Sequence, residues 1–264
     1  MTNHPSLQKA RELTHEAYQR RRQAKDYLPL LLEGLKLGKK FDDQPLVAQS
    51  HVAIGERYAA RGMPLKALHH LDQAETIYNL LASDDHHRWW LCHLHSFYGI
   101  AYDDLADYQK ALTHHLQSLA IARDLNDMEG HARGLLNSGW VYLQMGNGDQ
   151  AISYLTQVTA YTDFPHYASV AYGHLGNAYQ MREQFELAKK SYMQSANIVE
   201  DLNRKIRVLA RAVSCDVALE QYEQASAILK TIEELRKLLI DISVLGETFI
   251  LTAKTQLAVA HEKY

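Results

Sequence analysis

A short motif, Gly-x-x-Tyr, recurs four times along the chain, at intervals of 44, 40 and 37 residues. An alanine follows each motif glycine at the same distance of twelve residues. The glycines are Gly55, Gly99, Gly139 and Gly176, and the alanines are Ala67, Ala111, Ala151 and Ala188. A period of this length predicts an array of structural repeats that bury their apolar faces against one another.

The composition favours helices for these repeats. Only 13 Gly and 5 Pro are spread over 264 residues, without a Gly/Ser-rich or Pro-rich tract, which is too little turn material for an all-β fold. Between each glycine segment and its alanine segment lies a short turn, such as 146–148. Turns this short predict antiparallel helix hairpins. Gly on one helix opposite Ala on the other would let the helix axes approach to about 8–10 Å.

Proline positions support the same helix boundaries. Pro45 and Pro165 each follow an aspartate, Asp43 and Asp163, by two residues, which is the order of a capped helix start. Pro5 and Pro64 are likewise expected to open helices.

The pattern Leu-Gly-x-x-Tyr, then Ala, a large residue and Ala, resembles the tetratricopeptide repeat. It is most complete in 54–74 and 175–192. The repeats are longer than the usual length of about 34 residues, and 118–127 is related to 195–204. This resembles the long-helix subclass of kinesin light chains and of bacterial peptide-sensing and signalling proteins. The resemblance implies an all-α fold, a right-handed α-solenoid of antiparallel hairpins with about five to six repeats and a C-terminal helix.

One array is expected to fill residues 1–264. A degenerate first repeat, in which Tyr18 aligns with the motif tyrosines and Pro29 departs from the pattern, precedes four fuller repeats and a weakened one. The predicted segments are 6–43, 45–83, 86–127, 129–162, 165–203 and 204–240, followed by a capping or connecting helix at 243–264. No Gly or Pro ends that last helix, so an effector domain beyond Tyr264 is left open.

Charge and apolar patterning exclude several classes of partner. The net charge of −3 gives no general attraction to nucleic acid or to an anionic membrane. Neither a secretory signal nor a membrane span is predicted, and a cytoplasmic location is expected. Cys92 and Cys215 are expected to be buried structural cysteines rather than a disulfide.

No constellation of catalytic, cofactor-binding or metal-binding residues stands out, so the chain is predicted not to be an enzyme. The histidines at 86, 87, 93 and 95 lack the spacing of a metal site on a helix. His69-His70 and His114-His115 occupy nearly equivalent places in two second helices, which predicts a polar stripe on the outer surface.

The strongest functional signal lies on the first helix of each repeat. Positions −6, −2, +1 and +5 from the motif glycine face away from the buried arc and would line the concave groove of a tetratricopeptide-like stack. The face mixes amide, arginine and aromatic residues, which suit a peptide, because Asn both donates and accepts, Arg pairs with carboxylates and Trp offers an apolar platform. In the second repeat the face includes His93 and Phe97. The candidate ligand-binding residues are Arg133, Asn137, Trp140, Gln144, His174, Asn177, Arg207 and Arg211.

An alternative interpretation is that Trp140 and Phe97 pack between repeats and that the arginines are only solvated. The family's carboxylate clamp is not reproduced, since only Arg207 and Arg211 resemble its last element.

Two functions remain in competition. The first is a protein–protein interaction module that binds a peptide or helical segment of a partner in the concave groove. The second is the N-terminal sensory domain of a larger signalling protein, whose effector would follow Tyr264 and respond to a change in superhelix pitch.

Overall fold

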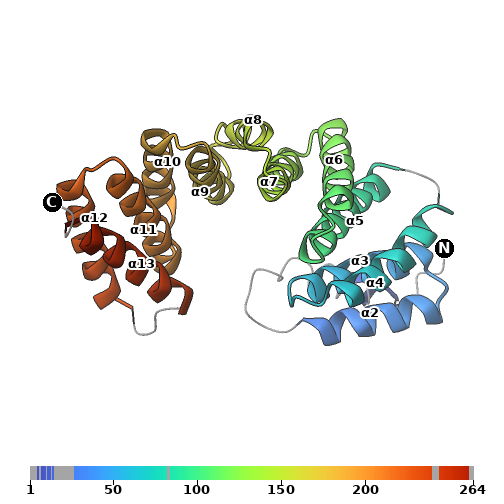
Figure 1. Cartoon of the computed structure of the whole chain (residues 1–264). Helices are drawn as coiled ribbons and strands as arrows, with labels where there is room; N and C mark the ends of the chain where they lie inside the picture. The colour runs from blue at the N-terminus through green and yellow to red at the C-terminus, as the bar shows by residue number, and fades with distance from the viewer. Residues whose placement is uncertain are drawn as a thin grey trace. The chain divides into compact units, whose positions relative to one another are not determined.

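The computed structural model describes Pro5, residues 7–9, Arg11, Glu12 and Thr14, and then 27–81, 84–239 and 244–261. Regular structure in these residues is helical, without a strand (Figure 1). The helices are α2 (Leu28–Lys40), α3 (Gln44–Ala59), α4 (Pro64–Tyr78), α5 (Asp85–Asp104), α6 (Tyr108–Asp124), α7 (Met128–Gln144), α8 (Gly148–Val158), α9 (Pro165–Met181), α10 (Phe185–Ile198), α11 (Leu202–Ala218), α12 (Tyr222–Lys237) and α13 (Val244–His261). The predicted all-α fold is confirmed.

The chain divides into two compact units, residues 1–134 and 135–264, with the boundary inside α7. In unit 1, α3 packs on α2 and α4, and α5 packs on α4, α6 and α3. In unit 2, α9 packs on α8 and α10, α11 packs on α10 and α12, and α13 packs on α11 and α12. Packing between neighbours in sequence is the arrangement of a helical repeat solenoid. We propose that each consecutive helix pair, from α3–α4 to α11–α12, forms one repeat of the solenoid.

The motif glycines admit a large side chain from the second helix of each hairpin. A Cβ atom would lie 2.8 Å from Leu71 Cδ2 at Gly55, and 2.6 Å from Leu155 Cγ at Gly139. At Gly99 and Gly176 the nearest atoms belong to the rings of His115 and Tyr192. Each of these partners stands 16 residues after its glycine.

The alanine twelve residues after each motif glycine was predicted to be its main contact. This prediction was wrong, because the nearest side chain belongs to the residue 16 positions after the glycine. Those alanines are fully buried. However, the nearest group of Ala67 to a Cβ at Gly55 is its carbonyl oxygen, at 3.4 Å. The larger residue, one helical turn after the alanine, lies against the glycine. The glycine therefore makes room for a large side chain and not for a second small one.

Helix starts agree with the proline positions, with one exception. The Asp43 side chain caps α3 by accepting a hydrogen bond from Leu46 N at 3.1 Å. Pro64 is the first residue of α4, as predicted. Pro165 opens α9, but the cap residue is Phe164 without a side-chain hydrogen bond, so the predicted cap at Asp163 was wrong.

The departure at Pro29 is harmless, because this proline is the second residue of α2, where a helix needs no backbone donor. Pro5 has helical backbone, and Tyr18 lies outside the described residues.

Several turns place a residue with a side chain in left-handed backbone conformation. The second residue after the helix is Ala106 after α5, Glu183 after α9 and Glu220 after α11, with φ of 58°, 57° and 58°. The equivalent residue after α7 is Gly146, with φ of 75°. Because only glycine adopts this conformation without steric cost, these turns are locally strained.

Replacing Glu183 by glycine is expected to raise the free energy of unfolding of unit 2 by up to about 1 kcal/mol, since the strain at this exposed turn is relieved. Urea unfolding followed by circular dichroism measures the change. Gly146→Ala is the reverse control and is expected to destabilise by a similar amount, because a Cβ there meets open space but a positive φ. Destabilisation by Glu183→Gly would contradict the turn geometry.

Candidate peptide-binding site

A cavity of about 370 Å³ lies in unit 2 between α9 and α11, and we call it the arginine cavity. One residue from α10 and one from α13 complete its wall. The lining residues are Ser169, Val170, Gly173, His174, Asn177, Ser195, Arg204, Arg207, Val208, Arg211 and Phe249.

Four of the predicted site residues line this cavity: His174, Asn177, Arg207 and Arg211. Helix periodicity brings them together. The two arginines are four residues apart on one face of α11, and His174 and Asn177 are three apart on one face of α9. Arg204, one turn before Arg207, is a third arginine that the sequence reasoning missed.

Asn177 is part of a hydrogen-bond network in the wall. Arg211 Nη1 donates to Asn177 Oδ1 at 2.8 Å. The buried Tyr192 hydroxyl lies 2.8 Å from both Asn177 Oδ1 and Gln180 Oε1. The carbonyl of Asn177 is thus used within the protein, and only its amide Nδ2 is left to donate to a ligand. The expectation that this side chain both donates to and accepts from a peptide is corrected accordingly.

The charge of the cavity is positive. Its lining residues include three arginines and no carboxylate. Burial, with the charges of Arg204 and Arg211, lowers the pKa of His174 to about 4, so this imidazole is neutral at pH 7. Burial and the neighbouring Arg207 also lower the pKa of Arg204. The Arg211 guanidinium lies 4.9 Å from the centroid of the Phe249 ring, a cation–π contact in the cavity wall.

The remaining candidates in unit 2 lie outside the lining. Trp140 is half-buried, and its ring centroid is 4.7 Å from that of His174, so it supports the cavity wall. Asn137, one turn earlier on α7, is half-buried, and Gln144 is the exposed last residue of α7.

Arg133 belongs to unit 1. Its charge acts on two buried groups there: it adds to the effect of burial in lowering the pKa of His115, and it opposes burial at Cys92, whose pKa is raised. Arg133 does not line the arginine cavity.

The predicted groove face fails in the second repeat. His93 is 2% exposed and Phe97 is 7% exposed. The His93 ring lies 4.1 Å from Trp89 and 6.0 Å from Phe97, centroid to centroid. Since α5 packs directly on α3, these large rings fill the space that a groove would need. The alternative interpretation, that Phe97 packs inside the array, is the correct one.

The predicted histidine stripe on the outer surface was wrong for His115, which is buried, while His70 and His114 are half-buried and each lies against a histidine of the first helix of its hairpin. His70 Nδ1 lies 2.9 Å from His51 Nδ1, and His114 Nδ1 lies 3.1 Å from His95 Nδ1. His115 is 2% exposed, against Gly99. The two histidine pairs occupy the same places in their repeats, four residues before and 15 residues after the motif glycine. This recurrence was the signal in the sequence that could have predicted the pairing.

Acidification is expected to destabilise unit 1 through its buried histidines. Burial lowers the pKa of His51 to about 4 and of His115 to about 3. The unfolded chain takes up these protons near pH 6.5, so stability present at pH 7 is lost as the pH falls from about 6.5 towards 4. Each of these groups is expected to cost about 1–2 kcal/mol at pH 5.

The check is the free energy of urea unfolding at pH 7.5 and pH 5, with His115→Leu as the matched variant. Leu71 and Leu155 occupy the equivalent position in other repeats, so leucine fits the site. The variant should lose less stability between the two pH values than the wild type. An equal loss in both would contradict the role of His115.

Both cysteines are buried and free of disulfides. Burial raises the pKa of the Cys92 thiol, and of Cys215 to about 12. Neither thiol is suited to act as a nucleophile at neutral pH.

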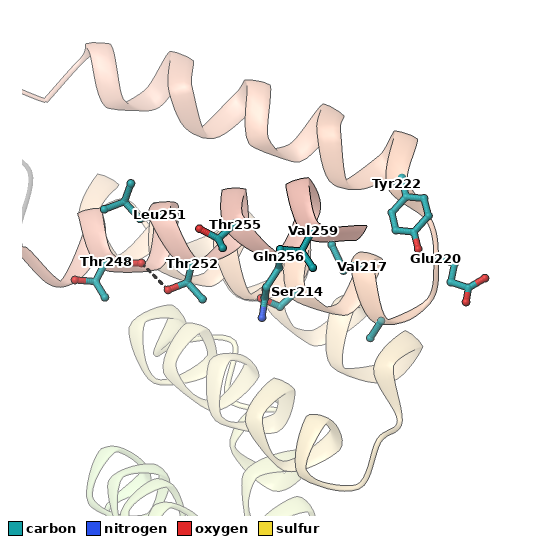
Figure 2. A pocket seen from close by; sticks show the side chains of 11 residues that line it. Ser214, Val217, Glu220, Tyr222, Thr248, Leu251, Thr252, Thr255, Gln256 and Val259 are labelled. Atoms are coloured by element: carbon teal, nitrogen blue, oxygen red, sulfur yellow. Dashed lines mark hydrogen bonds between the residues drawn. The ribbon is translucent and has the colours of Figure 1, made fainter. Parts of the chain in front are cut away.

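A second cavity in unit 2, of about 850 Å³, lies between α11 and α13 (Figure 2), and we call it the C-terminal cavity. Its lining residues are Ser214, Val217, Ala218, Glu220, Tyr222, Thr248, Leu251, Thr252, Thr255, Gln256 and Val259. None of these is among the ligand-binding residues predicted from the sequence. A degenerate motif, Gly246-x-x-Phe249, could have revealed the α13 side, because Leu251 stands five residues after its glycine.

Comparison with known proteins supports the repeat interpretation. Residues 90–162 match a family model described as tetratricopeptide repeat. Over 149 residues, 55% of its length, the chain is 28% identical to outer dynein arm-docking complex subunit 4 of Xenopus laevis, and it spans 28% of that protein.

Two solved structures show the same fold. One is a signal transduction ATPase with numerous domains and a tetratricopeptide repeat sensor, from Pyrococcus horikoshii. It has a TM-score of 0.76 and 18% identity over 98% of this chain and 43% of that one. The other is a protein with nearly identical repeats like those of kinesin light chain, from Podospora anserina. It has a TM-score of 0.59 and 18% identity over 73% of this chain and 97% of that one.

No helix among the described residues is long and apolar enough to cross a membrane. Scaffolds of this kind are generally non-catalytic and take proteins as partners. Residues 90–162 thus match the tetratricopeptide repeat, and the chain has the all-α repeat fold seen in kinesin light chain-like arrays and repeat sensor domains, a fold that generally supports protein interaction.

Proposed function

We propose that this chain binds an acidic peptide segment of a partner protein in the arginine cavity. One observation carries the proposal: three arginines line a single cavity whose lining holds no carboxylate. Asp201 already places a carboxylate near Arg204, outside the lining. An anionic group of a ligand would supply a carboxylate for Arg207 and Arg211, because guanidinium groups bind carboxylates through paired hydrogen bonds.

The size of the cavity fits part of a longer ligand. About 370 Å³ is near the lower end of the range for small-ligand pockets, roughly 300–1,000 Å³. Such a space takes one or two side chains of a peptide while the rest of the segment lies outside it. Arg207 and Arg211 would hold the carboxylate, the Asn177 amide would donate to the peptide, and Phe249 would cover its apolar part. In this proposal the chain is a cytoplasmic binding module and not an enzyme.

The test compares the wild type with Arg207→Gln, and with Lys190→Gln as a control for charge. Lys190 is exposed on α10 and lines neither cavity. A partner captured with the wild type is mapped to its binding segment, and the affinity of that segment is measured by calorimetry. Arg207→Gln should weaken binding by about 1–3 kcal/mol, roughly tenfold to a hundredfold. Equal affinity for all three proteins would exclude the arginine cavity.

A sensory role is the second candidate, favoured by the similarity to the repeat sensor from Pyrococcus horikoshii over 98% of this chain. Binding would then shift the array between conformations and act on an effector beyond Tyr264. Spin labels, one in each unit, would report a ligand-dependent change of distance in that case. An unchanged distance distribution at saturating ligand would leave the adaptor role.

A further inference from the structure

One face of α11 lines both cavities of unit 2. Arg204, Arg207 and Arg211 line the arginine cavity, and Ser214 and Ala218 line the C-terminal cavity. These residues follow one another at intervals of three and four, which places them on a single stripe of the helix. Helix α13 also lines both, with Phe249 in the first cavity and Leu251 in the second.

The C-terminal cavity differs chemically from its neighbour. Its wall holds apolar side chains that water still reaches, since Leu251 is 60% exposed and Val259 is 47% exposed. The Ser214 hydroxyl donates to Gln256 Oε1 at 2.7 Å, so these two polar groups satisfy each other. The lining holds no arginine or lysine, and its charged residue is Glu220. An apolar side chain fits this wall, and an anion would be repelled by Glu220.

The spacing between the cavities follows from helix geometry. On α11, the midpoint of the three cavity arginines is near Val208. The midpoint of the residues that line the C-terminal cavity is near Asp216, eight residues further along the helix. At a rise of about 1.5 Å per residue, this is roughly 12 Å. An extended peptide advances about 3.3 Å per residue. A ligand with one group in each cavity therefore has these groups about four residues apart.

We infer that the ligand is an extended peptide with an acidic residue in the arginine cavity and an apolar residue, about four positions away, in the C-terminal cavity. The inference rests on the proposed function and specifies its ligand. Charge selects the acidic residue for the cavity with the arginines. The exposed apolar surface beside Glu220 selects the apolar residue for the C-terminal cavity.

The probes are ten-residue fluorescein-labelled peptides of Gly and Ser that carry a Glu-Glu pair and a leucine, with fluorescence anisotropy as the measurement. In one peptide the leucine is four positions from the acidic pair, in a second it is adjacent, and in a third serine replaces it. A fourth peptide has Gln-Gln in place of Glu-Glu. The four-position peptide should bind the wild type at least tenfold more tightly than the serine peptide and the adjacent-leucine peptide.

Variants of the protein test whether the tighter binding of the four-position peptide comes from the C-terminal cavity. Leu251→Asp, and as a second variant Val259→Asp, should reduce the four-position peptide to the affinity of the serine peptide while leaving the serine peptide unchanged. Both residues are exposed, so the fold should tolerate the change. Leu187→Asp, exposed on α10, is the matched control and should bind as the wild type does.

The outcomes separate the two proposals. Binding that needs the glutamates and Arg207, but gains nothing from leucine at either spacing, would overturn the two-cavity inference and leave the proposed function intact. Equal binding of the Gln-Gln and Glu-Glu peptides, unaffected by Arg207→Gln, would overturn both. A gain from leucine that survives Leu251→Asp and Val259→Asp would place the apolar residue elsewhere and also overturn the inference.

Discussion

Gly176→Ala is expected to lower the free energy of unfolding of unit 2 by about 2–3 kcal/mol, a cost typical of overpacking in a core. A Cβ atom at this position would lie 2.5 Å from Tyr192 Cδ1. The Tyr192 ring is fully buried and its hydroxyl lies in the network around Asn177. The ring has no room to retreat, so the helices of this hairpin must move apart. Urea unfolding followed by circular dichroism measures the loss.

Gly173→Ala is the matched control, three residues earlier on α9. Its Cβ would lie 3.6 Å from Ser195 Oγ, an ordinary contact. Both substitutions gain the same helix propensity, about 1 kcal/mol. Gly173→Ala should therefore be neutral or stabilising. Equal stability of the two variants would mean that the second helix does not lie against the motif glycine.

Lys189→Met is expected to cost about 3–5 kcal/mol at neutral pH, because it leaves a buried carboxylate without its partner. Lys189 Nζ forms an ion pair with Asp216, whose side chain is inaccessible to solvent. Lys189 Nζ also donates to Gln221 Oε1 at 3.1 Å. The pair joins α10 to α11, the helix that carries the three arginines of the cavity. Urea unfolding of the variant at pH 7 measures the effect.

The pH dependence and a double variant identify the cause. Burial raises the pKa of Asp216. A carboxyl with a raised folded-state pKa is destabilising when ionised, so the deficit of Lys189→Met should shrink as the pH falls from 7 towards 4. Adding Asp216→Asn should recover most of the loss at pH 7. A deficit that is independent of pH and survives the second substitution would indicate lost packing instead of an unpaired charge.

The fold could be predicted because its signal is repeated. The recurrence of glycine, tyrosine and alanine at fixed distances revealed helix hairpins without any knowledge of tertiary contacts. The contact partner of the glycine could not be predicted, because helix geometry alone does not decide whether Ala188 or Tyr192 faces Gly176. The left-handed conformation of Glu183 could not be predicted either, because the short turn imposes it and the residue type does not indicate it.

The candidate site could be predicted only in part, because helix periodicity gives the direction of a side chain but not what lies opposite. The face that carries His174 and Asn177 does line a cavity. The equivalent face with His93 and Phe97 is filled, because these rings are large enough to reach the neighbouring helix. Arg204 was missed because it lies one turn before Arg207, the first groove position taken from that helix.

Site-specific photocrosslinking tests the proposed binding surface most directly. A benzophenone side chain in place of Val170, which lines the arginine cavity, is compared with one in place of Leu187 on α10. On irradiation of the complex with the captured partner, the position 170 variant should crosslink to an acidic segment of the partner, and the position 187 variant should not. Crosslinking from position 187, with none from position 170, would contradict binding at the arginine cavity.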